Sequence, residues 1–246
     1  VLTRERSPYL SRSWNVMHPI VPGSPLYGTT PASCHASELE ISVSVVGTDD
    51  TSLQPVHGRH RYLANEVVDS TGVPVAAVVA ESPSLARDAI DLIEVEYEPL
   101  PAVSDPELAL QPGAPLAHPE LGTNQAFSFP MKGGEVDGAF SRAAHIVKVR
   151  AEHNRIAGVP MEPRGVIARY DPGTEELTVW LTTQTPFSTR AELASVLGFP
   201  EQKLRLIAPD VGGGFGVKGP LYREEIVAAT LARRLGRPIQ WMSTRN

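Results

Sequence analysis

A cluster of glycines near the carboxyl end is the part of the sequence that points most directly to chemistry. Residues 210–218 read DVGGGFGVK, with four glycines in five positions broken only by Phe215. Ordered glycine costs backbone entropy, and one or two glycines satisfy an ordinary turn. Four glycines between an apolar run and a helix-like stretch therefore favour a loop whose bare backbone N–H groups lie against an anion or a cofactor.

Two phosphate-binding motifs resemble this loop only in part. Residues 214–219 match the pattern G-x-G-x-x-G of dinucleotide-binding proteins, which needs an acidic residue about 20 positions further on. The sequence there, WMSTRN, contains neither Asp nor Glu. A phosphate-binding P-loop is also excluded, because Lys218 is followed by Gly219 rather than by Ser or Thr. Nicotinamide binding therefore stays only as a distant alternative.

The histidines of the first sixty residues do not form a recognisable metal site. His18, His35, His57 and His60 lie there together with Cys34, the only cysteine in the chain. Their spacings fit no zinc signature, and isolated loop histidines are far more often solvated than bound to metal. We predict no metal ligand among the protein side chains.

Composition and charge exclude several classes of protein. The chain has 246 residues and a formal charge of −6, with Lys and Arg scattered, so a basic surface for nucleic acid is missing. No apolar run approaches the roughly 18 to 20 residues that a membrane span needs. A single cysteine cannot form an internal disulfide, which fits a reducing compartment. We expect a cytoplasmic protein without a membrane span.

The first half of the chain divides into three regions. Residues 1–72 are rich in loop-forming residues, and only LEISVSVVG, near Ile41, alternates as a strand does. In residues 73–110, a continuous apolar run predicts a strand that is buried on both faces. A helix is predicted next, capped by Ser82 and with Pro83 at its first position, and a second strand follows over 94–103. Residues 111–134 contain the prolines and glycines of a connector.

The second half, residues 135–246, has clearer periodicity. A turn at Pro172 and Gly173 separates two strands, and Thr185 and Gly198 bound a helix that begins with Pro186. The pattern as a whole predicts an α/β (α+β) fold. The expected strands cover residues 143–158, 164–183, 203–209 and 238–246, and the expected helices cover 185–198 and about 221–235.

Four blocks of this sequence, in order, resemble one known family. They are residues 73–103, GVPMEPRGVIARYD, TTQTPF and DVGGGFGVK. Together they are similar to the molybdenum-cofactor subunit of the xanthine oxidase and aldehyde oxidase family. The resemblance implies the C-terminal part of an α/β hammerhead domain over 73–110, followed by the first portion of a molybdenum-cofactor-binding domain over 135–246. Residues 1–72 match the family poorly.

The resemblance also implies roles for matched residues. Gln184 corresponds to the catalytic glutamine whose side-chain amide hydrogen-bonds an oxygen on molybdenum, and the pterin dithiolene rather than the protein holds the metal. Glu162 lies in a matched block as well, but Glu162 and Arg164 could equally form a structural ion pair. The positions of the cofactor-facing loop are Gly213, Gly214, Phe215 and Gly216.

As part of such a subunit, the chain would belong to a molybdenum hydroxylase that oxidises aldehydes, N-heteroaromatics or a similar small molecule with water as the oxygen source. The resemblance implies a molybdopterin cofactor, including its cytosine dinucleotide form, and partner subunits carrying iron–sulfur clusters and FAD. Gly219 stands where some members have a substrate-binding glutamate, which argues against purine recognition. The family's general base lies beyond the matched residues, so we expect the isolated chain to be inactive. The alternative is a non-catalytic binding or remnant domain with a cofactor-facing loop.

Overall fold

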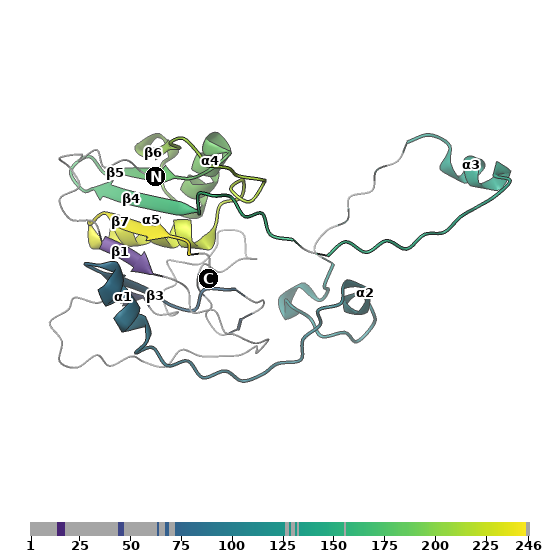
Figure 1. The fold of residues 1–246 in the computed structure, drawn as a ribbon, viewed down its shortest axis with the longest axis horizontal. Coiled ribbons are helices and arrows are strands. Elements are labelled where there is room, and N and C mark those ends of the chain that lie inside the picture. Colours follow the sequence, from purple (N-terminus) through teal and green to yellow (C-terminus); the bar gives the residue numbers. More distant parts are fainter. Residues whose placement is uncertain are drawn as a thin grey trace. The chain divides into compact units, whose positions relative to one another are not determined.

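The structure is a computed structural model that describes residues 14–17, 44–46, 63, 67–68, 72–125, 128, 131, 133–154 and 156–244. The chain forms two compact units (Figure 1). One unit combines Val1–Pro101 with Gly158–Asn246, and the other is Ala102–Ala157. The candidate site lies entirely in the first unit.

The first unit is built on one seven-stranded mixed sheet of order β2-β3-β1-β7-β4-β5-β6. Strands from the beginning and the end of the chain are neighbours in it, since β1 pairs with β7 in parallel and β4 pairs with β5 and β7 in antiparallel fashion. β6 joins the edge parallel to β5. The strands are β1 (Trp14–Met17), β2 (Ser44–Val46), β3 (Ala77–Ala80), β4 (Gly165–Asp171), β5 (Glu176–Leu181), β6 (Leu204–Ile207) and β7 (Ile239–Met242).

Among the described residues of the first unit, three α-helices pack on this sheet. They are α1 (Pro83–Ile90), α4 (Pro186–Val196) and α5 (Arg223–Leu235), and a short 3-10 turn, η3 (Glu201–Lys203), precedes β6. The second unit contains α2 (Pro106–Ala109), the 3-10 turn η2 (Pro119–Leu121) and α3 (Val136–Arg142). The α/β class predicted from the sequence is confirmed by this architecture.

The main core forms where α5 packs on β4, β5 and β7 and α4 packs on the edge strand β6. Alternate residues of β5, Leu177, Val179 and Leu181, are at most 1% exposed, as expected for a strand with one buried face. They pack with α4 residues such as Leu193 and with nearly the whole middle of α5, from Ile226 to Ala232. The loops of the candidate site connect these packed elements, one from β5 to α4 and the other from β6 to α5.

Strand β3 confirms the prediction of a strand buried on both faces. Ala77 and Val79 belong to the main core, whereas Val78 and Ala80 pack on the opposite side with Ala86 of α1. Helix α1 begins as predicted, because the Ser82 hydroxyl accepts a hydrogen bond from the Leu85 N–H at 3.2 Å.

Two segments that the periodicity predicted as strands are irregular. Residues 94–103 and 143–158 form no strand in the described part of the chain. Residues 145–154 are exposed, with Val147 and Val149 each 83% exposed, so no neighbouring strand supplies a hydrogen-bond ladder to them. An alternating pattern therefore predicted the wrong structure where a pairing partner was missing.

The amino-terminal region departs from prediction in a different way. β2 lies inside the predicted strand near Ile41, but β1 was missed by the sequence analysis. β1 sits between β3 and β7, so its neighbours come from distant parts of the chain. The rest of the loop prediction for residues 1–60 lies outside the described residues, and the domain boundaries stay predictions.

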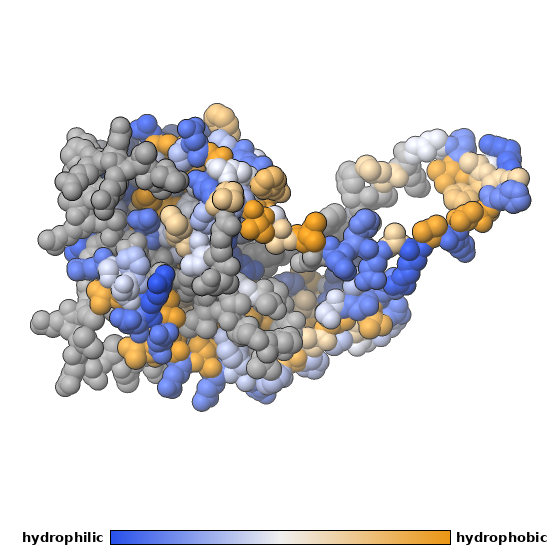
Figure 2. All heavy atoms as spheres, in the orientation of Figure 1, coloured by the Kyte–Doolittle hydropathy of each residue, from blue (hydrophilic) through white to orange (hydrophobic). Residues whose placement is uncertain are grey.

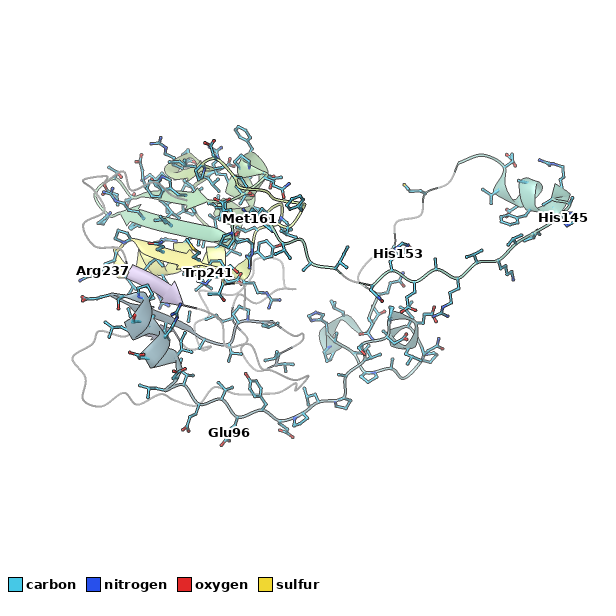
Figure 3. All side chains as sticks on the ribbon, in the orientation of Figure 1. Glu96, His145, His153, Met161, Arg237 and Trp241 are labelled. Carbon is cyan, nitrogen blue, oxygen red and sulfur yellow. The ribbon has the colours of Figure 1, made fainter. Side chains whose placement is uncertain are left out.

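The second unit exposes much of its apolar surface. Figure 2 shows apolar side chains gathered around α3, where Phe140 is 58% exposed. His145 and His153 lie apart on the extended segment that follows α3 (Figure 3). In the part of the chain that the structure describes, no cluster of three His, Cys, Asp or Glu side chains could hold a metal ion, and no helix is long and apolar enough to cross a membrane.

Candidate functional site

The glycine-rich loop connects β6 to α5 and folds against two other segments. One is the segment before β4, which contains Glu162, and the other is the connection between β5 and α4, which contains Gln184. The loop is tightly turned on itself, since the Val217 N–H donates to the Gly214 carbonyl at 2.9 Å. Met161, labelled in Figure 3, lies in the segment before β4 and is 86% exposed.

The glycines are required first by contacts within the protein. A Cβ on Gly212 would lie 2.6 Å from the Cβ of Glu162, and a Cβ on Gly214 would lie 2.3 Å from the Cδ of Gln184. Gly213 and Gly216 have φ values of +91° and +81°, which other residues rarely adopt. The loop therefore lacks side chains because it packs closely on these two polar residues and turns through left-handed conformations.

Phe215 departs from that pattern. It has a φ of 51°, unusual for a residue with a Cβ, and it is 76% exposed. One edge of its ring lies over Gly213, where a Cβ would be 3.2 Å from the ring. An exposed aromatic side chain held in a strained backbone conformation is a feature found at binding sites.

Gln184 is fixed at three points by the loop. Its backbone N–H donates to the Lys218 carbonyl at 2.9 Å, and its side-chain Oε1 accepts from the N–H groups of Gly216 at 3.1 Å and Lys218 at 3.3 Å. Backbone N–H groups can only donate, so the oxygen of the Gln184 amide must face the loop. The Nε2 group is thereby directed away from the loop as a donor of two hydrogen bonds.

Three donors at this site have no hydrogen-bond partner within the described residues. They are the Gln184 Nε2 group and the backbone N–H groups of Gly214 and Phe215. The structure thus brings the sequence-predicted residues together: the Gln184 side chain lies directly on the loop of Gly213, Gly214, Phe215 and Gly216. Clustered free donors suit a ligand with several oxygen acceptors.

Glu162 pairs with a residue that the sequence analysis did not select. Its Oε2 accepts from the Lys218 Nζ and from the Gly212 N–H, each at 2.7 Å. Desolvation by itself would raise the pKa of Glu162, but the hydrogen bonds from Lys218 and Gly212 and the Lys218 charge outweigh it and hold the pKa below its usual value. The Lys218 side chain is 0% exposed, so the pair reaches from the surface into the interior.

Arg164 has other partners, so the alternative of a Glu162–Arg164 pair is not formed. The Arg164 guanidinium lies 3.3 Å from Glu224 and 3.8 Å from Glu225, and it stacks 3.7 Å from the ring centroid of Tyr222. These contacts join β4 to the start of α5. Arg164 therefore holds the far end of the glycine-rich loop in place.

Threonine hydroxyls supply further anchors that the sequence analysis missed. Thr183 donates to the Lys218 carbonyl at 3.2 Å, and Thr185 donates to the Gly219 carbonyl at 2.7 Å. Thr185 occupies the predicted cap position of α4, but its side chain makes no capping bond and reaches across to the loop instead. Only the folded structure could reveal this, because Gly219 is 34 residues away.

The residues present fit a molybdenum cofactor bound through its own oxygen atoms. The three free donors can be matched by acceptors on such a group, and the described residues offer no metal-binding cluster of their own. That the pterin rather than the protein holds the metal stays a prediction from the family resemblance.

Comparisons with protein families cover most of the chain. Residues 39–101 match the a/b hammerhead domain of aldehyde oxidase and xanthine dehydrogenase, and residues 117–246 match the molybdopterin cofactor-binding domain. These matches confirm the predicted order of a hammerhead domain followed by a cofactor-binding domain.

Individual relatives agree with these matches. Subunit gamma of the 6-hydroxypseudooxynicotine dehydrogenase complex of Paenarthrobacter nicotinovorans is 41% identical over 186 residues, which cover 76% of this chain and 23% of that subunit. The carbon monoxide dehydrogenase large chain of Hydrogenophaga pseudoflava is 34% identical over 196 residues, covering 74% of this chain and 24% of the relative. Quinoline 2-oxidoreductase from Pseudomonas putida 86 superimposes with a TM-score of 0.78 and 32% identity, covering 96% of this chain and 31% of that one. The chain thus spans about a quarter of the length of the curated relatives it matches.

Proposed function

The chain belongs to the xanthine oxidase and aldehyde oxidase family, in its molybdopterin-binding subunit, and from this premise we propose that it forms part of a molybdenum hydroxylase. The substrate class we propose is a small aldehyde or N-heteroaromatic compound. Two of the relatives support the second class, since their names refer to 6-hydroxypseudooxynicotine and quinoline, both nitrogen-containing aromatic compounds. The relative named for carbon monoxide shows that the family's substrates differ widely.

One observation carries the proposal: the orientation of the Gln184 amide. When bound, a molybdenum cofactor supplies the oxidation of a substrate C–H bond to C–OH with oxygen from water. We assign to Gln184 the donation of a hydrogen bond from Nε2 to an oxygen of that cofactor. Two loop N–H groups bonded to Oε1 hold the amide in this orientation before any ligand arrives, so little reorganisation is needed.

The loop contributes in a second way. The free N–H groups of Gly214 and Phe215 are further donors for the cofactor, in line with the role proposed for residues 213–216. A neutral amide and backbone N–H groups can all donate to oxygen without competing as metal ligands. We therefore propose that this chain supplies donors for cofactor oxygen atoms and leaves the metal to ligands from the pterin.

The remaining features of the proposal concern the whole protein. We propose iron–sulfur and FAD subunits as partners, supported by the name of the relative that is a subunit of a complex. The cofactor would be molybdopterin, including its cytosine dinucleotide form. A cytoplasmic location is supported by the single cysteine of the sequence.

The test compares two substitutions of Gln184 in the enzyme that contains this chain. Gln184→Glu keeps an oxygen for the loop but loses the donor, and Gln184→Ala loses both. Each should keep its molybdenum and lose about 100- to 1,000-fold in turnover of aldehyde or N-heteroaromatic substrates, as when one preorganised donor is removed. Gln202→Ala, which alters an exposed glutamine of η3, is the matched control. Unchanged turnover in both Gln184 variants, or a wild-type protein without molybdenum, would favour the non-catalytic binding domain instead.

A further inference from the structure

Lys218 has an unusual position for a residue at the end of a surface loop. Its side chain is 0% exposed and is the largest fully buried side chain among the described residues. The ammonium group lies 2.7 Å from Glu162 Oε2, and the same oxygen accepts the Gly212 N–H. A single carboxylate oxygen thus ties together the first glycine of the loop and the lysine that follows its last turn.

The backbone of Lys218 is what holds Gln184. Its N–H donates to Gln184 Oε1 at 3.3 Å, and its carbonyl accepts the Gln184 backbone N–H at 2.9 Å. The Thr183 hydroxyl donates to the same carbonyl at 3.2 Å. The residue whose side chain is anchored on Glu162 is therefore the residue whose backbone orients the Gln184 amide.

We propose that the Glu162–Lys218 ion pair is a positioning device, which acts through the Lys218 backbone to keep the Gln184 amide oxygen on the loop and its Nε2 group available. Neither residue of the pair is assigned a contact with substrate or cofactor. The inference rests on the function proposed above for Gln184, although the positioning itself is a property of this chain alone.

Stability alone does not account for an ion pair whose lysine is buried. The Lys218 side chain is removed from water completely and Glu162 only in part, since Glu162 is 27% exposed, and this desolvation is costly. Replacing a buried ion pair by well-packed apolar residues is often neutral or stabilising. What a charged pair adds is a short, directional contact between defined atoms. The direction of the ion pair matters here, because the Lys218 backbone must form hydrogen bonds with both the backbone and the side chain of Gln184.

The experiment uses three variants of the purified enzyme that contains this chain. Lys218→Met fills the buried space without charge, Glu162→Gln keeps an acceptor for the Gly212 N–H, and the double variant removes both charges at once. Two properties are measured: hydrogen–deuterium exchange of peptides that cover residues 212–219, and kcat and KM. Melting temperature is recorded for each variant.

A positioning role predicts a local effect that is separate from stability. In both single variants the loop amides should exchange about tenfold faster, while peptides from β4 and β5 stay within about twofold of the wild type. Turnover should fall about 10- to 100-fold with little change in KM, because Gln184 is misplaced rather than lost. The double variant should recover the melting temperature, since no buried charge is unpaired, but should not recover kcat.

An exposed ion pair of the same unit provides the matched control. Lys203 lies 2.5 Å from Glu175, with side chains 38% and 66% exposed. Lys203→Met combined with Glu175→Gln should leave loop exchange and turnover unchanged, because exposed ion pairs are screened by solvent and contribute little to stability.

The outcomes separate this inference from the proposed function. Loop exchange that stays unchanged, or that rises equally in β4 and β5, would overturn the positioning role. A wild-type protein that binds no molybdenum would refute the proposed function, yet the exchange data would still decide whether the pair orients Gln184. If Lys218→Met does not fold, Glu162→Gln applies the same test with the buried lysine intact.

Discussion

Gly214 and Gln184 approach so closely that a Cβ on Gly214 would lie 2.3 Å from Cδ and 2.4 Å from Oε1 of the Gln184 side chain. The three nearest atoms to that position, Cδ, Oε1 and Cγ, all belong to the Gln184 side chain. The backbone of Gly214 itself does not require glycine, since its φ is not positive. Position 214 therefore requires glycine chiefly because any side chain there would collide with the amide of Gln184.

The first prediction follows from this contact. Gly214→Ala should displace the Gln184 side chain, so turnover in the complete enzyme should fall by about as much as in Gln184→Ala, on the order of 100-fold or more. Adding Gln184→Ala to Gly214→Ala should cause little further loss, because both changes remove the same interaction. Steady-state kinetics of the two single variants and the double variant provide the measurement.

A control for that prediction is available two residues further on. Gly216 has a φ of +81° and nothing within 4 Å of the position of a Cβ. Gly216→Ala should cost about 1 to 2 kcal/mol of stability through backbone strain, with or without Gln184. Additive turnover losses for Gly214→Ala and Gln184→Ala would contradict the proposed contact.

Glu225 predicts a pH dependence of stability. Burial raises its pKa from an ordinary value of 4.5 to about 7, and nearby Glu224 and Glu192 add to this, while the Tyr222 N–H and Arg164 act in the opposite direction. The unfolded chain therefore loses this proton at a lower pH than the folded one. The free energy of unfolding should fall as pH rises from about 4.5 to 7, by up to about 3 kcal/mol.

Glu225→Gln should remove this dependence. In the wild type, the Tyr222 N–H donates a hydrogen bond to Glu225 Oε2 at 2.9 Å. A glutamine can still accept this hydrogen bond, but its side chain carries no charge whose desolvation would cost free energy. Urea unfolding at pH 5 and pH 8 should show a smaller loss of stability at the higher pH in the variant than in the wild type. Parallel behaviour of the two proteins over that window would show that Glu225 does not titrate there.

Arg164 should not be replaceable by lysine. Its guanidinium makes two hydrogen bonds to Glu224, at 3.3 and 3.4 Å, while stacked on Tyr222 and 5.2 Å from the Trp241 ring centroid. Lysine keeps the charge but cannot form the planar fork or the stack, so Arg164→Lys should lower the free energy of unfolding by about 1 to 2 kcal/mol. Chemical denaturation gives this value directly.

A lysine substitution in β4, the strand that begins directly after Arg164, tests whether that loss is specific. The side chain of Arg169, in β4, makes no hydrogen bond or ion pair with the residues that the structure describes. Arg169→Lys should change stability by less than about 0.5 kcal/mol. Equal losses in the two variants would indicate a general effect of arginine rather than the stacked pair.

The isolated 246-residue chain should have no hydroxylase activity. It spans 23% of a curated relative, and the family resemblance assigns the general base to residues beyond those matched here. General acid–base catalysis alone contributes about 100- to 10,000-fold. Oxidation of an aldehyde or an N-heteroaromatic by the purified chain, measured with an artificial electron acceptor, would refute this expectation.

The sequence by itself was sufficient for features that depend on neighbouring residues. Ser82 caps α1, Gly198 and Gly236 end α4 and α5 in left-handed conformations, and the paired strands β4 and β5 lie where alternation predicted them. Motif order was also local information, and it was enough to identify the family and to select Gln184 and the loop of residues 213–216.

Tertiary structure decided everything that depends on pairing between distant residues. The strand at Trp14–Met17 exists because β3 and β7 flank it, whereas residues 143–158 alternate in sequence but find no strand partner among the residues that the structure describes. Likewise, the sequence placed Glu162 beside Arg164, but the fold pairs it with Lys218, 56 residues away. Lys218 becomes buried, and the Gln184 amide becomes oriented, only when the glycine-rich loop folds against the segments that contain Glu162 and Gln184. The hydrogen bonds responsible join residues that are far apart in the sequence, so the sequence alone could not predict them.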